Sequence, residues 1–158
     1  MDKYEFTGET KEVGVGFRKV ILKRIKAKVD FGNIKAGTLG GWIEKAENLS
    51  QDGDAWVFDN ARVGDNARVF GNAWVSGNAW VSDNARIYEE FHILVIGPIG
   101  SRQAHTTFYR DSGKGISVKC GCFNGSIDEF LKKVNETHGD NKHADAYRKA
   151  ARACKNTY

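Results

Sequence analysis

Residues 53–88 read GDAWVF, DNARVG, DNARVF, GNAWVS, GNAWVS and DNARIY, which are consecutive six-residue units without an insertion. Each unit carries one small residue, one aliphatic residue and a turn-forming pair. A fixed short period of this kind is typical of a solenoid, in which successive units stack their buried faces. Six residues are too few for a helical repeat, so this stretch predicts stacked short strands.

The order of residues within a unit predicts which side chains are buried. Alternate residues of a strand face opposite ways, so Ala61 and Val63 should point inward and Arg62 outward. The Asp-Asn and Gly-Asn pairs tolerate left-handed backbone angles and suit the corners between strands. The inward aliphatic place is taken in turn by Val57, Val63, Val69, Val75, Val81 and Ile87.

These units resemble the hexapeptide pattern of left-handed parallel β-helices, in which each unit forms one side of a triangular coil. Three units per coil place residues 18 positions apart one above the other. The outward side chains then form an aromatic, a cation–π and a cationic face. They pack on another subunit or on flanking parts of this chain, or they form a stacking platform for a base or sugar. This predicted oligomer or partner face consists of Trp56 over Trp74, Arg62 over Trp80, and Arg68 over Arg86.

The repeat continues upstream in a less regular form, and its extent sets the predicted domain boundaries. Read in the same frame, units begin at Leu39, Lys45 and Gln51, giving a little under three coils from Leu39 to Arg86. Apolar and charged residues alternate over 24–29, and with residues 3–6 they predict an N-terminal β layer that caps the coils. We therefore expect a β cap over 1–38, a hexapeptide-repeat β-helix over 39–90 and a separate domain over 91–158.

The C-terminal part has the pattern of a small α+β domain. Apolar runs predict strands over 91–96, 106–110 and 116–123, with residues 111–115 as a turn. Ser126 and Glu129 form a capping box that opens a helix ending at Gly139, and a second helix follows from about Asn141. The predicted arrangement is βββαα, so the whole chain is mainly β with an α+β tail. The buried helix positions are Ile127, Phe130, Leu131 and Val134, then Ala144, Tyr147, Ala151 and Cys154.

The loop 97–105 is the strongest candidate for a ligand-binding site. Its glycines let backbone N–H groups converge, while side-chain donors lie beside them, so the loop suits a phosphate or a carboxylate. It lacks the lysine of a P-loop and no helix follows directly, and a plain β-hairpin loop is the alternative. The candidate ligand-binding residues are Gly97, Gly100, Ser101, Arg102, His105, Thr107 and Arg110.

Neither catalysis nor metal binding is favoured by the sequence. Many hexapeptide β-helices are acyltransferases that use a histidine beside the coils, but residues 39–86 contain none. An acyltransferase would need His105, or another histidine, to reach across from a neighbouring subunit. Cys120 and Cys122 on one strand face, with His138 and His143, have no familiar zinc spacing. We assign no catalytic residue, metal or cofactor, and an odd count of three cysteines argues against a disulfide framework.

Several motifs outside the strict repeat resemble a group of small proteins common in bacteriophages and prophages. They are residues 35–44, 48–50 and the DNARV and GNAWV units. The tail is similar to a domain that often accompanies such repeats, through residues 96–102, 120–123, 128–130 and 138–141. Hexapeptide-repeat proteins are usually homotrimers, so the resemblance implies one here. It implies no activity that transfers residue by residue.

The phage origin that this resemblance implies points to an accessory protein that counters host defence. The leading interpretation is a non-enzymatic homotrimer that sequesters an anionic nucleotide-like signalling ligand at subunit or domain interfaces. The alternatives are an inhibitor that binds a host defence protein through the flat β-helix faces, and a hexapeptide-repeat acyltransferase.

Charge and hydropathy agree with this interpretation. The net charge of +4 over 158 residues favours anionic partners and counts against a DNA mimic. We expect no stable DNA binding. No apolar run approaches the roughly 20 residues of a membrane span, and no leader is visible at residues 1–4. We therefore expect the protein in the cytoplasm of the bacterial host, with no membrane partner.

Overall fold

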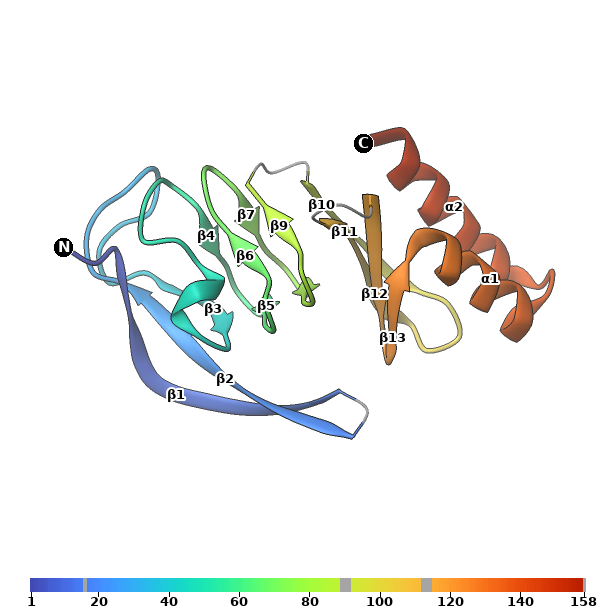
Figure 1. Ribbon diagram of the computed structural model, residues 1–158, viewed down its shortest axis with the longest axis horizontal. Coiled ribbons are helices and arrows are strands. Elements are labelled where there is room, and N and C mark those ends of the chain that lie inside the picture. The colour runs from blue at the N-terminus through green and yellow to red at the C-terminus, as the bar shows by residue number, and fades with distance from the viewer. Residues whose placement is uncertain (16, 89–91, 112–114, 158) are drawn as a thin grey trace.

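The computed structural model describes residues 1–15, 17–88, 92–111 and 115–157. Along its long axis a β-solenoid is followed by a four-stranded sheet and two helices, and an N-terminal hairpin runs beside the solenoid (Figure 1). The predicted boundary at 90/91, the start of a strand at Phe91 and the predicted turn residues 112–114 lie outside the described residues.

The solenoid is built from two-residue strands that stack in parallel. These are β4 (Trp56–Val57), β5 (Arg62–Val63), β6 (Arg68–Val69), β7 (Trp74–Val75), β8 (Trp80–Val81) and β9 (Arg86–Ile87). Trp56 pairs with Trp74, Arg62 with Trp80, and Arg68 with Arg86, so the predicted 18-residue phasing is confirmed. The alanine and valine or isoleucine positions of these units are fully buried. The left-handed winding implied by the resemblance stays a prediction.

The corners have the predicted left-handed backbone. Asp59, Asp65 and Asp83 have φ between 50° and 54°, and Gly71 and Gly77 have φ of 64° and 63°. Aspartate tolerates this region better than most residues and glycine adopts it freely, so the first residue of each turn pair ends the strand after two residues.

The upstream frame of the repeat was wrong. In β3 (Leu39–Ile43), Ile43 pairs with Val63, and Leu49, just after the 3₁₀ turn Ala46–Asn48, pairs with Val69. The buried aliphatic places of the first coil are therefore Ile43 and Leu49, whereas Leu39 is 49% exposed. Both pairs are 20 residues apart, so two additional residues lie between Leu49 and Val57. A strict six-residue count carried back from Gly53 misses this insertion.

The N-terminal layer is a long antiparallel hairpin of β1 (Tyr4–Val15) and β2 (Arg18–Ala27). β2 pairs with β3, which makes one sheet in the order β1-β2-β3-β5-β8. Tyr4 and Phe31 pack edge-on against Trp56, with ring centroids 6.3 and 5.3 Å away, and so close the first coil. The far end of the hairpin runs along the solenoid (Figure 1), where Arg18 pairs with Glu44 and Asp65.

The C-terminal part of the chain has four strands rather than the predicted three. They are β10 (Ile93–Ile99), β11 (Ala104–Asp111), β12 (Gly115–Cys120) and β13 (Phe123–Ser126), in that spatial order. The predicted strand 116–123 is broken because Gly121, with φ of 58°, and Cys122 form a tight turn that pairs Cys120 with Phe123. The helices α1 (Ile127–His138) and α2 (Lys142–Thr157) follow, with the predicted Ser126–Glu129 capping box in place.

The sheet lies between the solenoid and the helices, with alternate residues of β11 facing each side. Phe108 packs in the core formed with α1 and α2, whereas its neighbour Tyr109 packs in the solenoid core. The Trp80 amide donates a hydrogen bond to Thr107 Oγ1 at 3.2 Å, which ties the sheet to the last coil. In the described part of the chain, no helix is both long and apolar enough to cross a membrane.

Candidate ligand-binding sites

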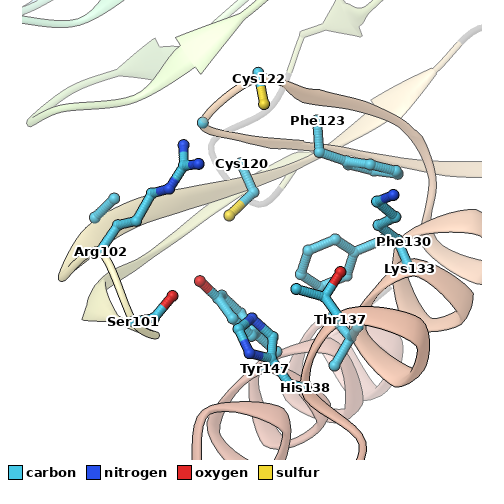
Figure 2. Close-up of a pocket in the computed structure, with 13 residues that line it drawn as sticks. Ser101, Arg102, Cys120, Cys122, Phe123, Phe130, Lys133, Thr137, His138 and Tyr147 are labelled. Carbon is cyan, nitrogen blue, oxygen red and sulfur yellow. The ribbon is translucent and has the colours of Figure 1, made fainter.

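One cavity opens on the helix side of the sheet, and we call it the helix-side pocket (Figure 2). Its volume is about 210 Å³. Its walls come from the β10–β11 turn, the β12–β13 turn and both helices. The lining residues are Ser101, Arg102, Ala104, Cys120, Gly121, Cys122, Phe123, Phe130, Lys133, Val134, Thr137, His138 and Tyr147.

The β10–β11 turn brings two predicted ligand residues to this pocket. The turn is closed by Gln103, whose backbone and side-chain N–H groups donate to the Gly100 carbonyl at 3.2 and 2.9 Å. Ser101 and Arg102 therefore stand at its tip (Figure 2). Gly100 has φ of 77°, and a Cβ there would lie 1.8 Å from the Tyr147 hydroxyl. Glycine is needed here because the phenol packs directly on the turn.

The β12–β13 turn supplies the opposite wall. The Cys120 thiol accepts a hydrogen bond from Thr106 Oγ1 at 3.2 Å. Cys122 sits in the turn and is exposed, so the two cysteines do not share a strand face as the sequence suggested. Among the described residues no group of three or more His, Cys, Asp or Glu side chains could hold a metal ion.

Aromatic side chains form the base of the pocket. Phe130 contacts Phe123 and Tyr147 with ring centroids 5.5 and 5.6 Å apart, and the His138 ring stacks 5.8 Å from Tyr147. Burial, followed by the nearby Cys120 thiol, raises the pKa of Tyr147, so its neutral hydroxyl is kept as a donor.

The charged groups of the pocket are cationic. Arg102 extends from the turn and Lys133 from α1 (Figure 2). Neither makes an ion pair with any residue that the structure describes. A pocket with an apolar base and free cations suits an anionic ligand that also has an apolar or aromatic part.

A second cavity, which we call the junction cavity, lies on the other side of the same sheet, against the solenoid. Its volume is about 310 Å³. The Arg62 guanidinium carbon and the Lys119 ammonium lie 4.2 and 4.6 Å from the centroid of the Trp80 ring. Burial lowers the pKa of both cations. The described lining is Arg62, Asn78, Trp80, Ala104, His105, Thr107, Lys119 and Gly121.

The predicted ligand residues thus divide between the two cavities. Ser101 and Arg102 line the helix-side pocket, whereas His105 and Thr107 line the junction cavity. Strand alternation separates them, because the side chains of β11 point alternately to the two faces of the sheet.

The remaining members of that set lie on neither lining. Gly97 is a strand residue whose missing side chain leaves room for His105, since a Cβ would come 2.7 Å from its Cα. Arg110 is exposed farther along β11, opposite Ile116. Lys119 and Tyr147 were not singled out as site residues, because nothing in sequence spacing shows that β12 and α2 reach these cavities.

The predicted partner face is divided as well. Trp56 is fully buried under the N-terminal layer, so it packs on this chain's own flank and offers no surface to a partner. Trp74 is 37% exposed beside Phe58. Trp80 is half-buried, and both Arg62 and Lys119 contact its ring. On the third face Arg68 is exposed, while Arg86 donates to the Asn66 carbonyl at 2.8 Å.

The repeat is also found in a known family model. Residues 61–77 match the YdcK beta-solenoid repeat. A 42-residue segment is 43% identical to "Uncharacterized acetyltransferase YdcK" of Escherichia coli (strain K12), covering 27% of this chain and 13% of that protein. Both matches support the β-solenoid. The chain spans only a small part of that relative's length.

Proposed function

We propose that this chain is a non-enzymatic binding protein that sequesters a small anionic, nucleotide-like ligand in the helix-side pocket. The observation that carries the proposal is that separate segments of the chain line the same cavity. Three segments far apart in the sequence, at 101–104, 120–123 and 130–138, meet with Tyr147 around one cavity. They overlap the stretches through which the tail resembles a phage-associated domain.

The chemistry of the pocket supports this ligand class. Arg102 and Lys133 suit a phosphate, and the Tyr147 hydroxyl and Ser101 add neutral donors. Phe123 and Phe130 offer an apolar base for an aromatic ring. The volume of about 210 Å³ is below the usual range of about 300–1,000 Å³ for ligand pockets. It fits one ring with its charged group while the rest of the ligand extends from the mouth.

Calorimetric titration of the full chain with adenine and guanine mononucleotides and cyclic dinucleotides tests the proposal. At least one ligand should bind, and both Arg102→Gln and Lys133→Gln should weaken its binding at least tenfold, since a charged hydrogen bond contributes about 1.5–3 kcal/mol. Lys132→Gln is the matched control, because Lys132 is exposed on the same helix and does not line the pocket. No binding at about 1 mM ligand, the range of very weak affinity, or equal loss in all three variants overturns it.

Assembly and biological setting are part of the same proposal. The homotrimer rests on the resemblance to hexapeptide-repeat proteins. The exposed rings of Trp74 and Tyr88 are apolar surface that an interface would cover, and light scattering that gives a monomer mass rejects the trimer. Sequestration of a host defence signal in the cytoplasm predicts that the pocket ligand accumulates in infected cells. Recovery of one host protein instead of a ligand favours inhibition of a partner through the solenoid faces.

Acyl transfer is a second candidate, favoured by two observations. A segment of the chain matches a protein named as an acetyltransferase, and His105 lies against the solenoid within the same chain, in the junction cavity. Such an enzyme requires the His105 imidazole as a general base. The candidate predicts acetyl-CoA turnover that His105→Ala abolishes, and unchanged turnover in that variant rejects it.

A further inference from the structure

The junction cavity contains a buried cation, Lys119, that makes no ion pair with a described residue. Burial has the largest effect on the pKa of its ammonium group and lowers it, whereas the charge of Asp83 raises it. Lys119 on β12 is only 3% exposed. No described carboxylate lies within ion-pair distance of its ammonium group. A buried ammonium group is costly unless it is paired, so its retention needs a reason.

A second cation shares the same ring. The parallel register of β5 and β8 places Arg62 beside Trp80, and the sheet places Lys119 on that ring as well. Cation–π contact with the indole compensates part of the desolvation of each charge. Two positive groups that contact one ring still repel each other, and an anion bound by both offsets that repulsion.

The rest of the lining is suited to an anion. Thr107 Oγ1 already accepts the Trp80 amide hydrogen, so its own hydroxyl hydrogen is available as a donor. Asn78 and His105 offer further N–H groups, and no acidic side chain is present in the described lining. Because both cations contact the Trp80 ring, the ring is not a free surface on which a ligand could stack. The charged groups must therefore recognise the ligand.

We propose that the junction cavity is a second binding site, separate from the helix-side pocket, for a phosphoryl group. Two cations with neutral donors match a doubly charged tetrahedral oxyanion, whose oxygens accept several charge-assisted hydrogen bonds at once. The volume of about 310 Å³ admits free phosphate or a small phosphate ester. Both carry the same chemistry, and the two probes below distinguish them.

The test is calorimetric titration of the full chain with inorganic phosphate and with glycerol 3-phosphate, at constant ionic strength and against chloride. Wild-type protein should bind at least one probe. Lys119→Met keeps the length of the side chain without its charge, and it should reduce affinity at least tenfold. Arg62→Gln should weaken binding in the same direction. Tighter binding of the ester identifies a phosphorylated small molecule as the ligand, and tighter binding of phosphate identifies the free ion.

The helix-side pocket provides the matched control. Arg102→Gln should leave phosphate affinity unchanged, whereas Lys119→Met should leave nucleotide affinity unchanged. Lys119→Met removes a buried charge, so it should fold with an unchanged or higher Tm. Phosphate should raise the Tm of wild type and of Arg102→Gln, but not that of Lys119→Met. Absence of binding by both probes, loss of binding in Arg102→Gln, or full binding by Lys119→Met overturns the inference.

Discussion

Gly100→Ala tests how the β10–β11 turn shapes the helix-side pocket. A Cβ at this position would lie 1.8 Å from the Tyr147 hydroxyl oxygen, 2.2 Å from Cζ and 2.8 Å from Cε2. Such distances require movement of the ring or of the turn. The ring is only 7% exposed and is held by Phe130 and His138, so any displacement disturbs the α1–α2 core.

The expected cost has two parts that a matched variant separates. Alanine with a left-handed backbone costs about 1–2 kcal/mol, partly offset by about 0.4–1 kcal/mol from the stiffer unfolded chain. Gly77→Ala carries only this part, because Gly77 has φ of 63° and nothing lies within 4 Å of its added Cβ. Complete loss of a buried aromatic ring costs about 3–5 kcal/mol. Partial displacement of Tyr147 should therefore bring the total for Gly100→Ala to about 3 kcal/mol.

Thermal and urea unfolding measure the difference. For a chain of this size, about 1 kcal/mol lowers Tm by about 2–4 °C. Gly77→Ala should thus shift Tm by a few degrees and Gly100→Ala by about 6–12 °C. In a Tyr147→Ala background Gly100→Ala should cost no more than Gly77→Ala, giving a coupling energy of about 2 kcal/mol. Equal destabilisation by the two glycine substitutions in the wild-type background would refute the reasoning.

Three further predictions concern the ends and the thiols of the molecule. Burial lowers the pKa of Lys3 to about 8 from its ordinary 10.5, so the unfolded chain binds more protons than the folded chain between these pH values. The free energy of unfolding of wild type, measured in urea and compared with that of Lys3→Met, should therefore rise from pH 8 to 10. Asn48 is fully buried and donates to two carbonyls of the next coil at 2.8 and 3.2 Å. Asn48→Ala should cost about 2–3 kcal/mol by the same assay, whereas a cost below about 0.5 kcal/mol contradicts the role of these bonds. In timed alkylation followed by mass spectrometry, exposed Cys122 should react first and Cys154 last, because burial raises the pKa of Cys154 to about 12.

The solenoid was predictable because one local pattern specifies it. Each unit carries its own inward valine or isoleucine and its own corner pair, so phasing by 18 gives the strand pairs directly. The prediction was wrong upstream, where Ile43 and Leu49 hold the buried places. Once two residues are inserted, period counting carries no information about where the frame shifts. Only burial against neighbouring coils decides it.

The sites were only partly predictable, because each depends on contacts between distant segments. The loop motif indicated Ser101 and Arg102 as ligand-binding residues. The structure places both in the lining of the helix-side pocket, and their role in binding stays a prediction. The motif also grouped them with His105. That side chain lines the junction cavity instead, because alternate residues of β11 face opposite sides of the sheet. Lys119 was read simply as a strand residue, since its burial arises from packing the sheet against Trp80, and no local pattern encodes that contact.

The position of the sheet explains why this chain needs both a repeat and a tail. One face of β11 closes the end of the solenoid through Tyr109, and the other closes the helical core through Phe108. A solenoid end without such a cover would expose unpaired strand edges.

Because Ala104 and Gly121 line both cavities, the cavities share a wall only one sheet thick. A ligand that fixes the β12–β13 turn from the helix side therefore also restricts Gly121 in the wall of the junction cavity, so the two affinities should be linked reciprocally. Titration of phosphate with the helix-side pocket saturated by its nucleotide ligand measures this coupling, and identical phosphate affinities with and without that ligand rule it out.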